Sequence, residues 1–164
     1  MVRSSIVAAA LVLALAACGS SQDRSGQARL PADPLALPEY DLTRYRDLIA
    51  GLAGTPLVVN FWGSWCGPCQ EEAPHLRQAS EEFEGRVQFL GVDMLDNRGA
   101  AREFIRRFDW RYPSIFDPDA EIRDGLGYFG QPITLIYDRR SEVAFNMPGA
   151  VDLELLRTEI RRVL

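Results

Sequence analysis

The feature that most constrains this chain is a short apolar strand that leads directly into a helix, with two cysteines at the junction. Residues 57–59 are Leu-Val-Val, a short β-branched run that predicts a buried strand. A helical pattern follows from Gly67 to about Glu84, and Cys66 and Cys69 stand at its start. The free N–H groups and the dipole of a helix N-terminus stabilise negative charge. A thiol at this position therefore ionises readily, and the thiolate is the reactive form.

The two cysteines occupy different sides of that helix. At roughly 100° per residue, Cys69 falls on the same apolar stripe as Ala73 and Leu76, whereas Cys66 stands at the exposed end. We therefore expect a Cys66–Cys69 redox disulfide in which Cys66 attacks and Cys69 resolves. One alternative is a structural disulfide, which would stabilise little over so short a loop. Another is a zinc site, for which one cysteine pair and one histidine leave the ligand set incomplete.

The residues around the pair resemble a known family. Residues 65–69, Trp-Cys-Gly-Pro-Cys, resemble the active site of the thioredoxin superfamily. The longer string 59–74 resembles its TlpA/ResA branch of extracytoplasmic, membrane-tethered thiol–disulfide oxidoreductases, and the resemblance covers about residues 55–164. It implies an α/β thioredoxin-like fold with a central mixed sheet, helices on both faces and a TlpA-type β/α insertion. In the related enzymes the pair between the cysteines, here Gly67 and Pro68, influences the redox potential. We expect both residues to contact the substrate, and we expect Trp65, which flanks the site, to form an apolar shoulder for it.

A second motif lies far downstream, at residues 130–134 (Gly-Gln-Pro-Ile-Thr). It resembles the loop that carries a cis-proline in thioredoxin-like folds. The resemblance implies that Pro132 lies beside Cys66 and that the Gln131 backbone pairs with an extended substrate segment. The alternative is a trans-proline that merely begins a strand.

Glu72 is a candidate proton carrier. The helical wheel places it on the inward side of the helix near Leu76, and a buried carboxyl group has a raised pKa. An acid at this offset also sits beneath the active site in the ResA-like family, whereas the thioredoxin acid falls at Asn60, which cannot titrate. We expect Glu72 to exchange the proton of Cys69. The alternative is a solvated helix glutamate.

The N-terminus predicts export. Residues 1–17 form a charged and then apolar segment that is too short for a comfortable membrane span. This segment ends in small residues before Cys18, which resembles a bacterial lipobox and predicts a signal peptide with Cys18 as the lipidated residue. The alternative is an ordinary signal peptide with Cys18 a passenger. Residues 18–38 predict a lipid anchor and flexible linker, and residues 39–164 the thioredoxin-like domain.

The remaining pattern alternates strands and helices. Residues 40–52 predict an entry helix, where many TlpA-like proteins carry a β-hairpin. Beyond the central strand (57–62) and its helix, we expect strands at 87–92, 112–116, 133–138 and 142–146, helices at 99–108 and 151–164, and a helical turn within 119–126. This order predicts a layered α/β sheet with helices on both faces.

The charge and the cysteine content argue against nucleic-acid binding and against a disulfide-stabilised fold. The 164 residues carry a net charge of −5, and the basic residues are scattered arginines, so no nucleic-acid site is expected. The three cysteines form one pair and one lone residue, which is not a disulfide framework. We expect a monomer without cofactor or metal.

Together these features predict a lipid-anchored thiol–disulfide oxidoreductase on the extracytoplasmic face of the bacterial cell membrane. It would exchange disulfides with exported cysteine-containing proteins as a reductase, with apocytochrome c thiols as one substrate by resemblance to ResA-like proteins. A membrane thiol electron-transfer partner would sustain the reduction.

Three other functions stay open. A disulfide-forming oxidase uses the same pair in reverse, because direction follows the reduction potentials of the partners. A redoxin-type peroxidase expects a Thr or Ser three residues before its reactive cysteine and a proline four before that, where this chain has Gly63 and Val59. The last is a non-catalytic binding lipoprotein on the same scaffold, which the intact cysteine pair disfavours.

Overall fold

A computed structural model describes residues 29–164 of the chain. The expected signal peptide, Cys18 and the first part of the expected linker lie outside these residues. In the described part the strands are β1 (Leu57–Trp62), β2 (Gln88–Met94), β3 (Ser114–Asp117), β4 (Ile133–Tyr137) and β5 (Val143–Pro148). The helices are α1 (Leu42–Gly51), α2 (Gly67–Glu82), α3 (Arg98–Arg107), α4 (Glu121–Gly125) and α5 (Leu153–Val163).

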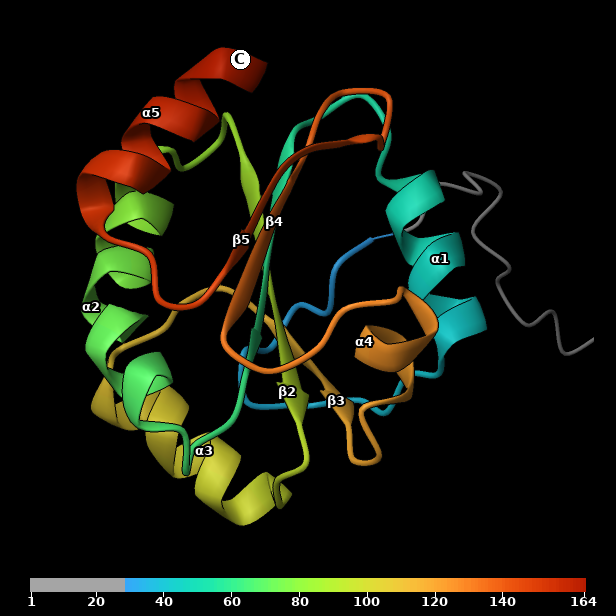
Figure 1. The fold of residues 1–164 in the computed structure, drawn as a ribbon, viewed down its shortest axis with the longest axis vertical. Helices are drawn as coiled ribbons and strands as arrows, with labels where there is room; N and C mark the ends of the chain where they lie inside the picture. Colours follow the sequence, from blue (N-terminus) through green and yellow to red (C-terminus); the bar gives the residue numbers. More distant parts are fainter. Residues whose placement is uncertain (1–28) are drawn as a thin grey trace, which may run out of the picture.

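The strands form one mixed sheet with the order β3-β2-β1-β4-β5 (Figure 1). β1 is central and all six of its residues are buried, as expected for a strand covered on both faces. It pairs in parallel with β2 and antiparallel with β4. α3 connects the parallel strands β2 and β3.

Helices cover both faces of the sheet (Figure 1). α2, α3 and α5 bury their apolar stripes against one face, where Trp62 and both cysteines belong to the core. α1 and α4 cover the other face, whose core includes Tyr45 and Phe61. The predicted α/β architecture with helices on both faces is confirmed, and the expected entry helix is present as α1.

The expected linker of residues 18–38 is wrong at its C-terminal end. Leu37 is 0% exposed and belongs to the core beneath α3, and Leu35 packs against the same cluster. The Phe116 N–H donates to the Pro38 carbonyl at 2.9 Å, so this segment lies along the edge of β3. Two apolar side chains among the prolines bury enough surface to order the segment. The packed domain therefore begins before residue 39.

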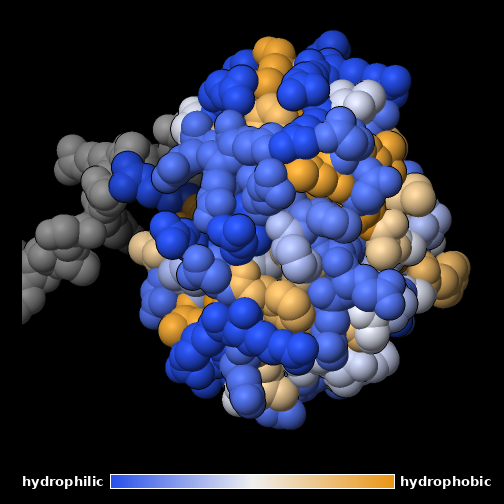
Figure 2. Space-filling model, turned by 90° about the vertical axis from the view of Figure 1, so that its left-hand side faces the viewer, coloured by the Kyte–Doolittle hydropathy of each residue, from blue (hydrophilic) through white to orange (hydrophobic). Residues whose placement is uncertain are grey.

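The outer surface of α2 and α5 is largely hydrophilic, with separate apolar patches between the polar side chains (Figure 2). Within residues 29–164, no helix is both long enough and apolar enough to cross a bilayer.

Candidate active site

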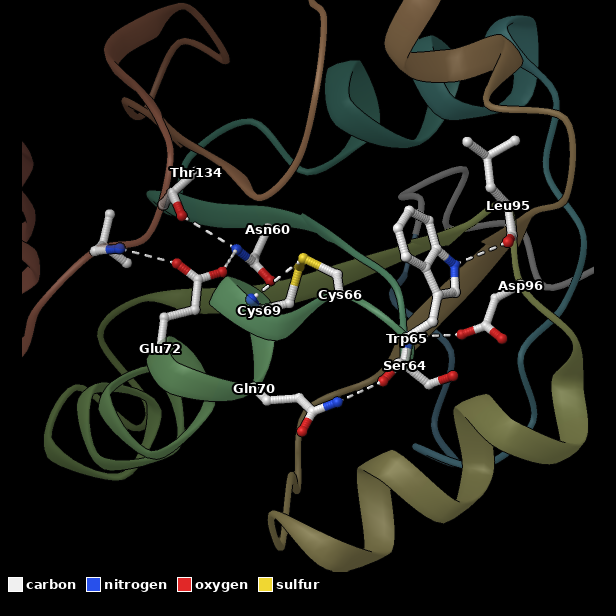
Figure 3. Close-up of a disulfide and its surroundings, with 11 residues drawn as sticks. Asn60, Ser64, Trp65, Cys66, Cys69, Gln70, Glu72, Leu95, Asp96 and Thr134 are labelled. Atoms are coloured by element: carbon white, nitrogen blue, oxygen red, sulfur yellow. Dashed lines mark hydrogen bonds between the residues drawn. A yellow bond between two sulfur atoms is a disulfide. The ribbon is translucent and has the colours of Figure 1, made fainter.

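The two cysteines form a disulfide at the N-terminus of α2 (Figure 3). Cys66 is the N-cap residue, and its Sγ accepts the Cys69 backbone N–H at 3.3 Å. Cys69 is 1% exposed and faces the core, as the helical wheel predicts, but Cys66 is only 4% exposed. The expectation of an exposed Cys66 is therefore wrong for the disulfide form, because this sulfur belongs to the same core cluster as Trp62 and Ala73.

Residues 63–65, which lead to Cys66, are held by hydrogen bonds to the turn that follows β2. The Ser64 N–H donates to Asp96 Oδ2 at 2.6 Å, and Trp65 Nε1 donates to the Leu95 carbonyl at 2.9 Å (Figure 3). Gln70 on α2 also holds this segment, because its Nε2 donates a hydrogen bond to the Ser64 carbonyl at 2.9 Å. With its nitrogen held, the Trp65 ring remains 58% exposed beside the disulfide. That position suits the apolar shoulder expected of this residue.

The loop of residues 130–132 lies next to the segment that leads to Cys66. The Gln131–Pro132 peptide bond is cis. Phe61 pairs with Ile133 in the β1–β4 register, so the two preceding residues of the loop lie across from the segment after β1. A Cβ atom built on Gly63 would lie 3.1 Å from Gln131 Nε2, which shows how closely the loop packs against the approach to Cys66. Residues 63–66 and 130–132 are thus neighbours in the fold.

Glu72 is 1% exposed and lies one turn beyond Cys69 on α2, on the inward side that the helical wheel predicts. Its Oε1 accepts Asn60 Nδ2 at 2.8 Å, and its Oε2 accepts the Val151 N–H at 2.9 Å (Figure 3). Burial raises the pKa of Glu72 from 4.5 to about 7, although both hydrogen bonds act in the opposite direction. A carboxyl group with this pKa can gain or lose a proton near neutral pH.

Sequence reasoning missed the partners that hold this carboxyl group. Asn60 Nδ2 also contacts Thr134 Oγ1 at 3.2 Å, because the two residues face each other in the β1–β4 register. The Val151 carbonyl lies 3.1 Å from Nδ1 of His75, which is half-buried. Only the pairing of distant strands brings these groups together, so no local pattern could have indicated them.

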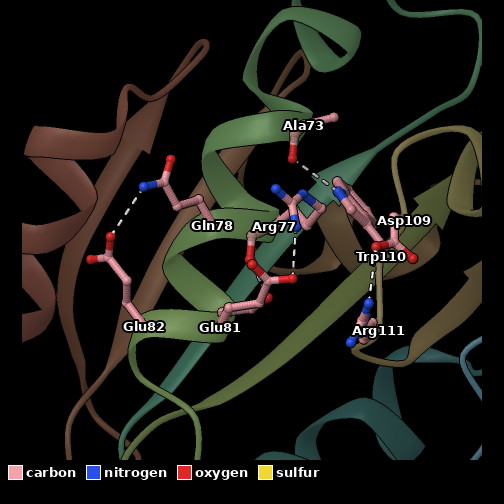
Figure 4. Close-up of polar contacts among 9 residues, drawn as sticks. Ala73, Arg77, Gln78, Glu81, Glu82, Asp109, Trp110 and Arg111 are labelled. Carbon is pink, nitrogen blue, oxygen red and sulfur yellow. Dashed lines mark hydrogen bonds and ion pairs between the residues drawn. The ribbon is translucent and has the colours of Figure 1, made fainter.

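Trp110 is a second residue whose role the sequence does not reveal. Its ring is buried, and its Nε1 donates to the Ala73 carbonyl of α2 at 3.0 Å (Figure 4). It packs edge-on against Trp62, with ring centroids 5.1 Å apart. The two rings therefore fix the side of α2 that carries Cys69. In the described part of the chain, no group of three or more His, Cys, Asp or Glu side chains is placed to hold a metal ion.

A mixed sheet between two helical layers, with a cysteine disulfide at the first turn of a helix beside a cis-proline loop, defines a thioredoxin-like protein. The sequence profile of the AhpC/TSA family matches residues 35–146, more than half of the chain, and the chain belongs to this family.

Curated relatives and solved structures agree with this class. The "Thiol:disulfide interchange protein DsbE" of Pseudomonas aeruginosa is 30% identical over 129 residues, which cover 75% of this chain and 70% of that protein. The "Thiol-disulfide oxidoreductase ResA" of Bacillus thuringiensis subsp. konkukian is 24% identical over 111 residues, and the match covers 67% of this chain and 64% of the relative. The chain therefore spans somewhat less than two thirds of the length of that ResA.

Among solved structures, a secreted Mycobacterium tuberculosis disulfide oxidoreductase, described as homologous to the DsbE of E. coli, superposes with a TM-score of 0.63 at 27% identity. The superposition covers 69% of this chain and 85% of that one. A DsbF homologue from Corynebacterium diphtheriae gives a TM-score of 0.65 at 26% identity, over 70% of this chain and 75% of the other. The thioredoxin-like fold is thus shared with proteins described as disulfide oxidoreductases.

Proposed function

We propose that this protein is a thiol–disulfide oxidoreductase in which Cys66 attacks and Cys69 resolves. The observation that carries the proposal is the position of Cys66 Sγ, which caps α2 and accepts the Cys69 N–H at 3.3 Å. After reduction of the disulfide, a thiolate at residue 66 faces this N–H and the positive end of the helix dipole. Cys69 lies deeper, within reach of Cys66 but not of a protein substrate.

The exchange proceeds in two balanced steps. The Cys66 thiolate attacks one sulfur of a substrate disulfide, forms a mixed disulfide and expels the other substrate sulfur as a thiolate. The Cys69 thiolate then attacks Cys66 Sγ, closes the Cys66–Cys69 disulfide and releases the second substrate sulfur. Two electrons pass from the pair to the substrate. The reverse sequence forms a substrate disulfide and reduces the pair.

The substrate is an exported cysteine-containing protein that approaches in extended form. Trp65 offers an exposed apolar surface beside the disulfide, and the loop of Gln131 and Pro132 packs against the approach to Cys66. An extended segment can pair with such a backbone edge, while Gly67 and Pro68 leave the first turn of α2 without bulky side chains.

In this mechanism Glu72 exchanges a proton with the thiol of Cys69. The carboxyl group lies one helical turn from Cys69, is buried, and has a pKa of about 7. It accepts the proton of Cys69 when this thiol must attack, and it returns the proton when the pair is reduced. A Glu72→Gln variant keeps the shape and cannot titrate. If its thiol pKa values and turnover equal those of the wild type, Glu72 has no part in proton transfer.

The direction we propose is reduction, with apocytochrome c thiols as one substrate and a membrane thiol protein as the electron donor. The resemblance to ResA-like proteins and the Gly-Pro pair between the cysteines support this direction. The reduction potential of the Cys66–Cys69 pair tests it, because a potential near that of strongly oxidising proteins would instead make the protein a disulfide-forming oxidase.

We further propose an extracytoplasmic location with a lipid anchor on Cys18. The N-terminal sequence pattern and the description of one structural relative as secreted support this location. Labelling of cells with a radioactive fatty acid tests the anchor. The wild-type protein should incorporate the label and a Cys18→Ser variant should not, whereas an unlabelled wild-type protein would remove the anchor from the proposal.

Turnover with insulin and trapping of partners test the central claim. The wild-type protein should reduce insulin disulfides in the presence of a dithiol, and a Cys66→Ser variant should not. A Cys69→Ala variant should accumulate mixed disulfides through Cys66, because no second thiol is present to release the substrate. Trapping through Cys69 in a Cys66→Ala variant at the same rate would reverse the two roles. A lack of insulin reduction would favour the non-catalytic binding protein.

Peroxide reduction is a second candidate function, because redoxin peroxidases share much of this fold and the chain belongs to the AhpC/TSA family. Gly63 occupies the position of the hydroxyl residue that those enzymes use, and it has no side chain to orient a peroxide. A Cβ atom there would also lie within 3.0 Å of Trp65 Nε1 and 3.1 Å of the Met94 carbonyl. Measuring peroxide consumption alongside insulin reduction separates the two functions.

A further inference from the structure

Five large apolar side chains are exposed among residues 29–164, and three of them lie at the end of the sheet that carries the disulfide. Trp65 follows β1, Leu95 follows β2, and Phe129 precedes β4. β1 runs parallel to β2 and antiparallel to β4, so these three loops leave the sheet at the same edge. Single exposed apolar residues are ordinary, but a group of them around one site indicates a contact surface.

The three loops meet at Gly63. A Cβ atom built on this glycine would lie 3.0 Å from Trp65 Nε1, 3.1 Å from Gln131 Nε2 and 3.1 Å from the Met94 carbonyl oxygen. Trp65 Nε1 also donates to the Leu95 carbonyl at 2.9 Å, which holds the indole ring beside residue 95 (Figure 3). Gln131 belongs to the loop of Phe129, two residues further along the chain. The loops that carry the three exposed side chains are therefore joined by direct packing.

The other two exposed apolar side chains, Val143 and Leu164, lie at the opposite end of the sheet. Val143 pairs with Tyr137 of β4, which in turn pairs with Leu57 at the start of β1. The Leu164 carbonyl accepts a hydrogen bond at 3.1 Å from Arg139, which follows β4 directly. Val143 is 45% exposed, the same fraction as Leu95, so it offers a matched comparison away from the disulfide.

Leu95 is an unfavourable residue for the backbone conformation it adopts. Its φ of 54° lies in the left-handed region, which glycine and asparagine adopt more readily than leucine. Nearly half of its side chain is exposed, so packing within the fold offsets only part of this cost. A left-handed backbone together with an exposed apolar side chain indicates a residue that contacts a partner molecule.

The sulfur atom of Cys66 is recessed relative to these side chains. Cys66 is only 4% exposed in the disulfide form, whereas Phe129 is 83% exposed and Trp65 is 58% exposed. A substrate that brings its own sulfur into contact with Cys66 Sγ must therefore place the neighbouring residues against the protruding side chains. An extended segment can do this, because its side chains project away from its backbone on both sides of the cysteine.

We propose that Trp65, Leu95 and Phe129, which we call the apolar rim, select substrates whose cysteine lies in an extended segment between apolar side chains. This inference rests on the proposed exchange at Cys66 and names the class of substrate that the exchange favours. Contact between an apolar substrate side chain and the rim removes apolar surface from water, which stabilises the complex before exchange. A charged side chain at the same place would lose part of its hydration.

Exchange with two short peptides tests the apolar rim on the reduced full chain. Each peptide carries one cysteine linked to thionitrobenzoate, with leucine on both sides of the cysteine in one peptide and serine in the other. Attack of the Cys66 thiolate on the peptide sulfur releases the coloured thionitrobenzoate anion and gives a second-order rate constant. The wild-type protein should react about tenfold faster with the leucine peptide, as expected for partial burial of apolar side chains.

Three variants locate this preference. Phe129→Ser should lower the leucine-to-serine ratio of rate constants about fourfold and Leu95→Asn about twofold, since each removes part of the apolar rim. Leu95→Asn should not lower the urea midpoint of unfolding, because asparagine adopts the left-handed conformation more readily than leucine does. Val143→Ser is the matched control and should keep the wild-type ratio.

The outcomes separate the apolar rim from the exchange itself. Equal rate constants for the two peptides, or a ratio that falls as far in Val143→Ser as in Phe129→Ser, would overturn the rim and leave the proposed exchange intact. A lower urea midpoint for Leu95→Asn would remove Leu95 from the rim. A reduced protein that reacts with neither peptide nor with hydroxyethyl disulfide would overturn the proposed function, and the rim with it.

Discussion

The protonation of Glu72 makes a quantitative prediction about stability. In the folded protein the pKa of this carboxyl group is about 7, against an ordinary value of 4.5. The folded state therefore holds the proton more tightly than the unfolded state does. The stability that this neutral group contributes is fully present below its unfolded pKa and is lost as the pH rises through about 7. One pKa unit corresponds to about 1.4 kcal/mol, so the full effect is about 3 kcal/mol.

Urea unfolding of the oxidised protein measures this effect, because the cysteines in a disulfide do not titrate. About 2.5 kcal/mol of the Glu72 effect falls between about pH 5 and about pH 8.5. The wild-type protein should therefore lose about 2.5 kcal/mol more unfolding free energy over this range than the Glu72→Gln variant does. The other titrating groups are common to both proteins and cancel in the comparison.

A Glu71→Gln variant is the matched control, because Glu71 is the adjacent residue of α2 and its side chain is exposed. It should show the pH dependence of the wild type. If the Glu72→Gln variant also shows the wild-type pH dependence, then Glu72 is ionised at its ordinary pKa in the folded protein. The assignment of a proton to this carboxyl group at neutral pH would then be refuted.

Three further predictions concern stability. Gly91→Ala should lower the free energy of unfolding by about 2 kcal/mol, because a Cβ atom there would lie 2.2 Å from Ser114 Oγ; an unchanged urea midpoint would show that the site can relax. Asp152→Ala should cost about 1 kcal/mol, since Asp152 Oδ1 accepts the Leu155 N–H at 2.8 Å at the start of α5, and Asp152→Asn should restore most of that loss. Trp110→Phe should cost about 1 kcal/mol or more through its lost hydrogen bond to α2, and thermal unfolding without a lower midpoint would count against that bond.

Most of the fold could be predicted because its signals are local. The run of six buried residues in β1 and the apolar stripe of α2 are visible within short windows of sequence, and both elements lie where their patterns place them. The inward orientation of Glu72 follows from the same helical spacing. The prolines around Leu37 predict a linker, and only its burial beneath α3 shows that this residue belongs to the core.

The polar contacts of the site could not be predicted, since they join distant parts of the chain. Asn60 and Thr134 are 74 positions apart, and Ser64 and Asp96 are 32 apart. Their contacts depend on the register of β1 with β4 and on the turn after β2. No periodicity within either segment specifies these pairings. The sequence therefore predicts the fold, but it does not predict which groups form hydrogen bonds with the reactive residues.

Because Cys66 is both the N-cap of α2 and half of the disulfide, chemistry at one sulfur alters the first turn of a helix. An anionic sulfur binds the Cys69 amide more strongly than a neutral one does. Hydrogen exchange at that single amide should thus slow when the disulfide is opened to a thiolate. The exchange rate of the Cys69 amide would then report whether the Cys66–Cys69 pair is reduced or oxidised.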